Sequence, residues 1–257
     1  MIYLYIITCV IIYLLFSYDS KNNYVYNKLQ IYTIPKHEIL QNIDKNIIFI
    51  VRNFTSEFNY LTPEYLINNY SNQIINAHTT ISEQYERKII KMTLANFFKR
   101  YNKESLYIKE DIDFIYKTRL HKRIDIKMRN YFTNLFLRYY FIWIGSKGTK
   151  TGLHKDGDDQ NYLLQLYGNK RVILFRSDND SKFKIRKEKE GGASLSSLDY
   201  WKDRIDIQKK EIVLNPGDIL SIPCGWWHCA ENLNQSIAIS CRSESMIGFI
   251  SKLLNNN

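Results

Sequence analysis

Apolar and polar positions alternate differently along the chain and predict a mixed first half followed by a strand-rich second half. The run IIFIV, residues 47–51, is apolar throughout and predicts a buried strand. Helices are expected in LTPEYLINNY, residues 61–70, and in MTLANFFKRYN, residues 92–102. In each segment a threonine, Thr62 or Thr93, stands where its hydroxyl can accept a backbone N–H of the first helical turn. The first half therefore combines strands and helices.

The second half, from Tyr139 onward, is a series of short apolar segments separated by Gly, Pro, Asn and Asp. After an earlier short strand, LYIKE, the strand-like segments are YYFIWIG, LLQLYG, KRVILF, EIVLNPGDILSIP and SIAISCR. Short strands with frequent turn residues are typical of a β-sandwich or barrel. Because 257 residues suffice for one full-sized core, we expect a single mainly β domain after the apolar leader.

The leader MIYLYIITCVIIYLLF, residues 1–16, contains no charged side chain. A helix needs about 20 apolar residues to cross a bilayer core, and Ser17 and Tyr18 could extend the stretch into the interface. We therefore interpret residues 1–18 as a transmembrane signal anchor, with the globular domain over residues 19–257. Lysines follow the stretch and none precedes it, so the positive-inside rule predicts a single-pass membrane protein whose domain faces the cytosol. A cleaved signal peptide is less favoured, and a buried first strand or helix is the other alternative.

The net charge of +10 is compatible with binding to nucleic acid or to an anionic surface. The chain is also crowded with Asn, Ile and Tyr, a bias that an A+T-rich genome imposes, so part of the lysine excess is compositional. The densest basic run, KFKIRKEKE at residues 182–190, is interrupted by glutamates and predicts a solvated loop. The four cysteines form no C-x-x-C pair and are expected to be reduced thiols.

Two histidines and an aspartate form the candidate chemical site. His154 and Asp156 stand two residues apart at a predicted strand edge, so their side chains project from one face. His228 follows the turn NPGD, the strand ILSIP and two tryptophans. Two imidazoles and one carboxylate are the facial triad that holds non-haem Fe(II) and leaves coordination positions open. The alternative is that His154 lies on an exposed turn and that His228 only packs among the tryptophans.

Two long segments around these residues resemble a known family. WIGSKGTKTGLHKDGDDQNYLLQLYGNKRVILF and LNPGDILSIPCGWWHCAENLNQSIAIS are similar to the JmjC, or cupin-like, Fe(II)- and 2-oxoglutarate-dependent oxygenases, in the branch that contains small protein hydroxylases. NIIFIVRNF, LTPEYLINNY and MTLANFFKRYNKESLYIKEDIDF resemble the N-terminal strand and helices of that branch. The resemblance covers residues 32–242. It implies a double-stranded β-helix, or jelly roll, over about residues 131–242, after an α/β lead-in over about residues 30–130.

The resemblance also implies a site. His154, Asp156 and His228 would bind Fe(II). Lys170 would pair with the distal carboxylate of the cosubstrate 2-oxoglutarate, Thr151 would donate its hydroxyl to that carboxylate, and Asn161 would lie near the cosubstrate and the iron. These three residues are the expected cosubstrate contacts. Tyr139 or Tyr140 could supply a further phenol to the cosubstrate pocket. The alternative for either one is a role as a core aromatic.

Two positions depart from the family pattern. The segment GDDQ before Asn161 is one residue longer than in some relatives, so Asp158 or Asp159 is an alternative to Asp156 as the metal ligand. Where some relatives place an asparagine near the iron-bound carboxylate, this chain has Ser240 or Arg242.

The activity implied by the resemblance is that of a dioxygenase that uses Fe(II), 2-oxoglutarate and O₂ and releases succinate and CO₂. A protein or peptide side chain is the expected substrate, and hydroxylation is the expected outcome. The alternatives are an RNA-base hydroxylase, an N-methyl demethylase, and a catalytically silent, membrane-tethered cupin that binds a partner. The segment Ser243–Asn257 predicts one short amphipathic helix, so we expect a monomer or a weak homodimer.

Overall fold

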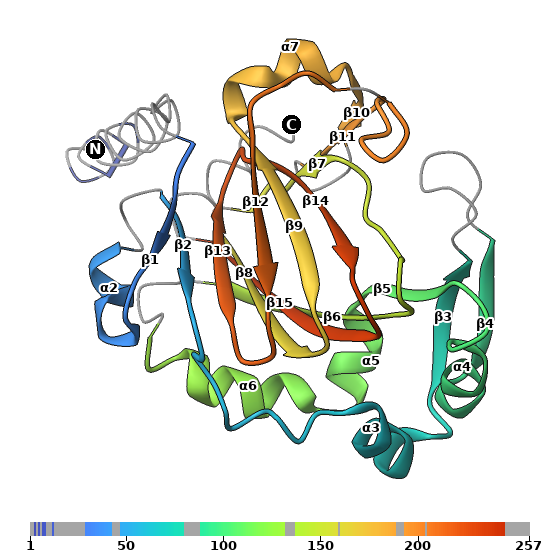
Figure 1. Ribbon diagram of the computed structural model, residues 1–257. Helices are drawn as coiled ribbons and strands as arrows, with labels where there is room; N and C mark the ends of the chain where they lie inside the picture. The colour runs from blue at the N-terminus through green and yellow to red at the C-terminus, as the bar shows by residue number, and fades with distance from the viewer. Residues whose placement is uncertain are drawn as a thin grey trace.

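Two β-sheets pack against each other in the computed structural model of the chain, and helices cover the outer face of the larger sheet (Figure 1). The structure describes residues 29–42, 47–79, 88–131, 137–158, 160–188, 193–203 and 205–244, together with Tyr3, Tyr5, Ile7, Thr8 and Ile12. In this part of the chain the larger sheet has nine strands and the smaller sheet six. The expected mainly β, jelly-roll-like fold is confirmed.

The strands of the larger sheet are mostly antiparallel, and only the first two, among the described strands, run parallel. Their order across the sheet is β1 (Ile31–Thr33), β2 (Ile48–Val51), β13 (Ile219–Pro223), β8 (Gln160–Tyr167), β15 (Ser236–Glu244), β6 (Leu137–Gly145), β5 (Leu106–Asp111), β3 (Ile74–Thr79) and β4 (Ile89–Thr93).

The smaller sheet carries much of the candidate site. Its order is β10 (Ile185–Glu188), β11 (Ser194–Ser196), β7 (His154–Lys155), β14 (Trp227–Asn232), β9 (Lys170–Phe175) and β12 (Lys209–Leu214). The α-helices are α2 (Ile39–Asn42), α3 (Pro63–Tyr70), α4 (Leu94–Arg100), α5 (Ile112–Lys117), α6 (Leu120–Met128) and α7 (Asp180–Phe183), and the short 3₁₀ helices are Lys36–Glu38 and Ser177–Asn179.

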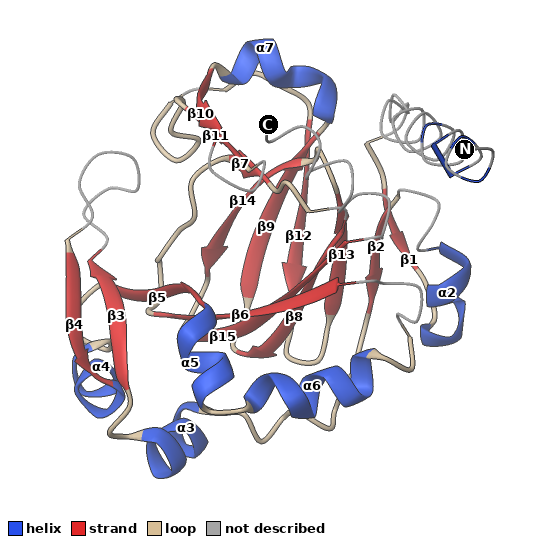
Figure 2. Cartoon of the chain, turned by 180° about the vertical axis from the view of Figure 1, so that it is seen from behind, coloured by secondary structure: helices blue, strands red, loops and turns tan. Residues whose placement is uncertain are grey.

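Strands β2, β13 and β15 of the larger sheet are buried on both faces. On the inner face Ile50 belongs to the same apolar cluster as Val172 of the smaller sheet. On the outer face Phe49 shares a cluster with Phe114 and Ile124 of the helices. Figure 2 shows α5 and α6 lying across this outer face. Burial on both faces explains why residues 47–51 lack polar alternation, since no side of this strand meets water.

The predicted helix starts are confirmed. The hydroxyl of Thr62 accepts the backbone N–H of Tyr65 at the start of α3, and Pro63 occupies the first turn. The hydroxyl of Thr93 accepts the backbone N–H of Asn96 at the start of α4. Each hydroxyl satisfies a donor that the helix itself leaves without a partner. These local patterns thus place both helices against the core.

The predicted single-pass membrane location, with a domain facing the cytosol, is wrong, and the predicted transmembrane anchor has no support in the described residues. No described helix combines the length and the apolar composition that a membrane crossing requires. The physical reason is length. A helix needs about 20 apolar residues to cross a bilayer core, and the leader, residues 1–16, is shorter than that. Most of residues 1–18 lie outside the described part of the chain.

Two other predictions have mixed outcomes. The expected loop over residues 182–190 is wrong where the chain is described, since α7 ends at Phe183 and Ile185–Glu188 forms β10. Strand β10 forms because its backbone pairs with β11, a partner that the charged residues of this segment did not indicate. Of the expected C-terminal helix, Ser243 and Glu244 belong to β15, and residues 245–257 lie outside the described residues.

Candidate metal centre

Three residues far apart in sequence come together as the His-Asp-His group, defined as His154, Asp156 and His228. Their ligand-type atoms all lie within 4.8 Å of one another. The register of β7 and β14 places the two histidines directly opposite each other. Oxygens of Asp156 lie 3.8 Å from Nε2 of His154 and 3.6 Å from Nε2 of His228. His154 therefore lies in a strand beside His228, not on the exposed turn of the alternative interpretation.

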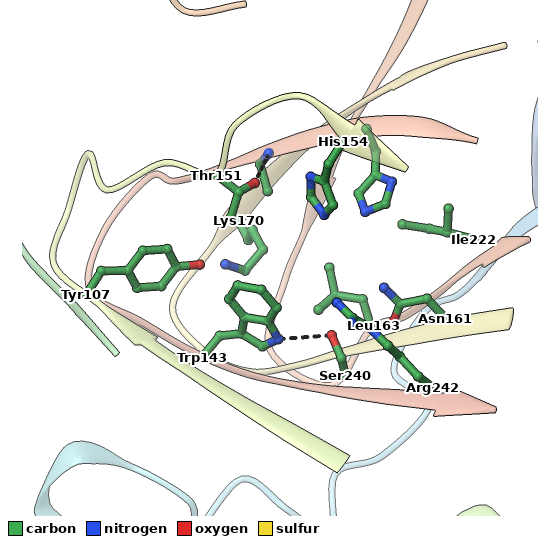
Figure 3. Close-up of a pocket in the computed structure, with 12 residues that line it drawn as sticks. Tyr107, Trp143, Thr151, His154, Asn161, Leu163, Lys170, Ile222, Ser240 and Arg242 are labelled. Atoms are coloured by element: carbon green, nitrogen blue, oxygen red, sulfur yellow. Dashed lines mark hydrogen bonds between the residues drawn. The ribbon is translucent and has the colours of Figure 1, made fainter. Parts of the chain in front are cut away.

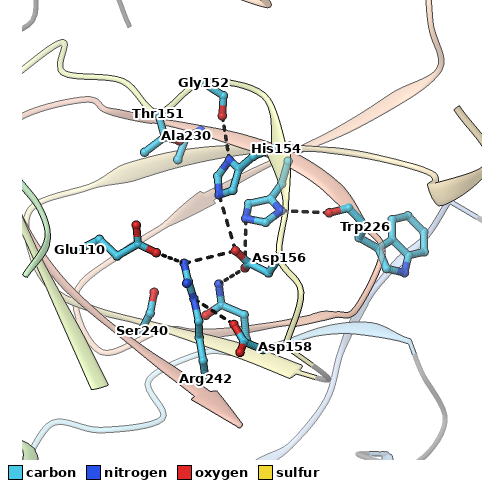
Figure 4. A network of polar contacts seen from close by, with 12 residues as sticks. Glu110, Thr151, Gly152, His154, Asp156, Asp158, Trp226, Ala230, Ser240 and Arg242 are labelled. Carbon is cyan, nitrogen blue, oxygen red and sulfur yellow. Dashed lines mark hydrogen bonds and ion pairs between the residues drawn. The ribbon is translucent and has the colours of Figure 1, made fainter. Parts of the chain in front are cut away.

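Both imidazoles are held by backbone carbonyl groups (Figure 4). Nδ1 of His154 lies 2.8 Å from the carbonyl oxygen of Gly152, and Nδ1 of His228 lies 3.0 Å from that of Trp226. A carbonyl oxygen only accepts, so each Nδ1 carries the proton and each Nε2 presents a lone pair to the group. Burial, followed by the neighbouring His228, lowers the pKa of His154 to about 3. At neutral pH this imidazole is in the form that binds metal ions.

Asp156 is buried and ionised. Asn161 donates from Nδ2 to Oδ2 of Asp156 at 2.7 Å, while Oδ1 is buried without a hydrogen bond. Burial raises the pKa of Asp156, but the nearby charge of Arg242, together with the two histidines and the hydrogen bond from Asn161, holds it well below its ordinary value. Oδ1 of Asp156 lies 3.2 Å from Nη2 of Arg242 without forming a hydrogen bond, so its lone pairs can still be offered to a bound cation. The donor set of the His-Asp-His group therefore fits a divalent metal ion.

The charges around the group also fit a dication. Nη2 of Arg242 lies 2.6 Å from Glu110 and 3.2 Å from Asp156, and its Nε lies 3.6 Å from Asp158. Three carboxylates thus surround one guanidinium, an excess of two negative charges that a divalent ion would balance. Asp158, the predicted alternative ligand, pairs with Arg242 and does not join the group, and Asp159 lies outside the described residues.

The two histidines line a pocket that is partly open to solvent (Figure 3). Lys170, Thr151 and Asn161, the three expected cosubstrate contacts, all line it. Its other lining residues are Tyr107, Trp143, Leu163, Ile222, Ala230, Ser240 and Arg242. The pocket therefore combines an apolar wall with polar groups placed at separate points, which is the usual composition of a small-molecule site.

Lys170 and Thr151 are fixed in the pocket by strand β14. Lys170 is only 3% exposed, and its Nζ donates to Oδ1 of Asn232 at 2.6 Å. Asn232 is neutral, so this bond orients the ammonium group without cancelling its charge. The hydroxyl oxygen of Thr151 accepts the backbone N–H of Ala230 at 2.8 Å. Its hydroxyl hydrogen can consequently be donated to a ligand.

The pocket aromatics differ from the expectation. Tyr140 donates its hydroxyl to Asp125 at 2.7 Å and is a buried core residue. Tyr107 of β5, not Tyr139 or Tyr140, is the phenol among the described pocket-lining residues. Trp143 donates its indole N–H to Ser240 at 3.0 Å across the pocket floor. Sequence reasoning named Ser240 but missed Tyr107 and Trp143, because the pairing of β5 with β6 is not encoded by any local motif.

The sequence matches one family model and is similar to several known proteins. A family model described as a cupin-like domain matches residues 51–241, more than half of the chain. JmjC domain-containing protein F of Dictyostelium discoideum is 29% identical over a match covering 38% of this chain and 25% of that protein. HSPB1-associated protein 1 of Homo sapiens is 29% identical over 36% of this chain and 21% of that protein. Lysine-specific demethylase 8 of Xenopus tropicalis is 27% identical over 38% and 23%. Each match spans a quarter or less of the relative.

Proposed function

Because this chain belongs to the cupin-like family of JmjC oxygenases, we propose that it is an Fe(II)- and 2-oxoglutarate-dependent oxygenase that hydroxylates a protein side chain. The observation that carries the proposal is the His-Asp-His group, in which two Nε2 atoms and a carboxylate converge within 4.8 Å. Both Nδ1 atoms are committed to carbonyl groups, so the lone pairs face inward.

In this proposal His154, Asp156 and His228 hold the iron. The bound iron would supply oxidative decarboxylation of 2-oxoglutarate by O₂, coupled to oxidation of a substrate C–H bond, with succinate and CO₂ as products. Asn161 keeps the carboxylate of Asp156 oriented through its 2.7 Å hydrogen bond. The chain's own contribution is thus a fixed set of donor atoms whose orientation does not depend on the ligand.

Lys170 and Thr151 bind the distal carboxylate of 2-oxoglutarate in this proposal. A buried lysine held by a neutral amide favours an anion, because the pocket offers it little water. The hydroxyl hydrogen of Thr151 adds a second donor beside it. The apolar side chains of Leu163 and Ile222 line the same pocket and reduce the polar surface around the bound anion.

A protein side chain is the proposed substrate because two similar proteins are named as a lysine-specific demethylase and an HSPB1-associated protein. Demethylation is the second candidate, supported by the name of the first of these relatives. The two outcomes differ in the carbon that is oxidised. Oxidation of a methyl carbon attached to nitrogen releases that carbon, whereas oxidation of another carbon leaves a stable alcohol.

Succinate formation by the purified full chain tests the proposal, with Fe(II), ascorbate and 2-oxoglutarate supplied. We expect succinate from the wild type and none from His154→Ala. His37→Ala is the matched control, because the side chain of His37 is 80% exposed. Metal-dependent binding of 2-oxoglutarate is measured in the same samples, since an enzyme tightly coupled to a missing substrate would bind without turnover. Absence of both succinate and binding in the wild type would contradict the proposal. Peptide and RNA pools then identify the substrate class.

A further inference from the structure

Arg242 lies between the candidate metal ligand Asp156 and two carboxylates at the edge of the site (Figure 4). Its guanidinium is 4.8 Å from the ring centre of Phe141, and its side chain is only 11% exposed. The register of β15 and β8 places Arg242 directly opposite Asn161. Arg242 is therefore a fixed part of the site and not a mobile surface residue.

The arginine and a metal ion would share Asp156. Nη2 of Arg242 lies 3.2 Å from Oδ1 of Asp156, the oxygen that has no hydrogen bond. A guanidinium stays protonated at any physiological pH. It would withdraw negative charge from this oxygen and repel a dication bound next to it. Arg242 thus opposes the binding of a metal ion on its own.

The same guanidinium favours an anion in the pocket. Arg242 lines the pocket together with Lys170, and the two cations come from different strands, β15 and β9. Figure 3 shows both side chains around the same space, with His154 beside it. A dicarboxylate placed there would neutralise Lys170 at one end and Arg242 near the other. Its negative charge would also offset the repulsion between Arg242 and the metal ion.

We propose that Arg242 couples the two binding events, so that the site holds its divalent metal ion tightly only when the organic dicarboxylate is bound. This proposal rests on the oxygenase function proposed above and adds that the metal ion and the dicarboxylate bind cooperatively. Coupling of this kind is reciprocal: the metal ion and the dicarboxylate each raise the affinity of the other by the same factor. Glu110 sets the strength of the effect, because its 2.6 Å ion pair neutralises part of the charge of Arg242.

The test is a set of Mn(II) titrations of the full chain, in which electron paramagnetic resonance counts the free ion, with and without 2-oxoglutarate. For the wild type we expect 2-oxoglutarate to tighten Mn(II) binding by about 10-fold or more, within the usual range of coupling factors. For Arg242→Gln we expect tighter binding of Mn(II) alone, weaker binding of 2-oxoglutarate, and a coupling factor that falls to about 2.

Three further variants separate coupling from folding. Glu110→Gln should act in the opposite direction, with weaker binding of Mn(II) alone and a larger coupling factor. Arg242→Lys keeps the charge, so its coupling factor should lie between those of the wild type and Arg242→Gln. Arg129→Gln is the matched control, since Arg129 also pairs with an aspartate, Asp125 on α6, at 2.5 Å. We expect Arg129→Gln to bind both ligands as the wild type does.

The outcomes distinguish the two proposals. If the wild type binds both ligands and neither Arg242→Gln nor Glu110→Gln changes the coupling factor, the role of Arg242 is refuted and the oxygenase function stands. If the wild type binds neither ligand, the oxygenase function fails and the role of Arg242 fails with it. If Arg242→Gln does not fold, the opposite shift in Glu110→Gln and the intermediate value in Arg242→Lys still decide the question.

Discussion

Asp180 accepts a hydrogen bond of 2.6 Å from the indole N–H of Trp227. Its other carboxylate oxygen lies 2.6 Å from Nζ of Lys155. Lys155 stands between the two ligand-type residues of the β7 segment, and Trp227 directly precedes His228 on β14. One carboxylate of α7 therefore connects the two chain segments that carry the His-Asp-His group.

Replacing Asp180 by alanine should weaken metal binding, because outer partners orient the residues that hold the ion. We expect the Kd of Mn(II) to rise by about 10-fold, the lower end of the effect of such partners. Asp178→Ala is the control, since Asp178 pairs with Arg176 at 2.6 Å on the same segment. Mn(II) affinity equal to that of the wild type in Asp180→Ala would show that the connection is not needed to orient the group.

Replacing the buried Lys170 by methionine should weaken anion binding strongly and leave Mn(II) binding measured without 2-oxoglutarate intact. We expect the Kd of 2-oxoglutarate, measured by calorimetry with Mn(II) present, to rise by about 100-fold or more, since an anion in this pocket would lose its buried charge partner. The melting temperature should not fall, because an apolar side chain replaces a buried charge. Lys209→Met, on the exposed strand β12, should leave the affinity unchanged. Unchanged affinity in Lys170→Met would instead place the anion elsewhere.

Gly168→Ala should destabilise the turn that delivers Lys170. Gly168 has φ +67°, and an added Cβ would lie 1.8 Å from the carbonyl oxygen of Gln235. The backbone must shift to relieve this contact, so we expect a loss of about 3 kcal/mol in the free energy of unfolding. Gly148→Ala separates the strain of a positive φ from the steric contact. Gly148 has φ +78° but nothing within 4 Å of the added Cβ. This variant should lose only about 1 kcal/mol in urea denaturation. Equal losses in the two variants would rule out the steric contact.

The thiols should differ in reactivity toward iodoacetamide. Burial raises the pKa of Cys241 to about 12, so its reactive thiolate is scarce from pH 7 to pH 9. Cys224 is partly exposed, and its sulfur lies 3.9 Å from the backbone oxygen of Asp156. Peptide mass spectrometry of the native protein at pH 8 should show Cys224 alkylated and Cys241 unmodified. Urea should expose Cys241, and rapid labelling of Cys241 without urea would contradict the burial of β15.

Local features were predictable where the cause was local. The two capping threonines act within one helical turn, and the strands of the second half are bounded by residues that favour turns. The spacing of His154 and Asp156 also has a local consequence, since residues two apart in an extended chain share a face. The membrane location was predicted wrongly because it rested on apolar composition alone, which does not distinguish a membrane helix from other apolar segments.

The sequence by itself determined the residue types of the candidate site, the mainly β class and the positions of most strands. It did so because side-chain periodicity, capping and turn preference depend on neighbours a few residues away. Only the tertiary structure decided that His228 lies opposite His154, that Tyr107 lines the pocket and that Arg242 contacts Asp156. Those relationships depend on strand register and sheet order, which arise from packing between segments that lie far apart in the chain.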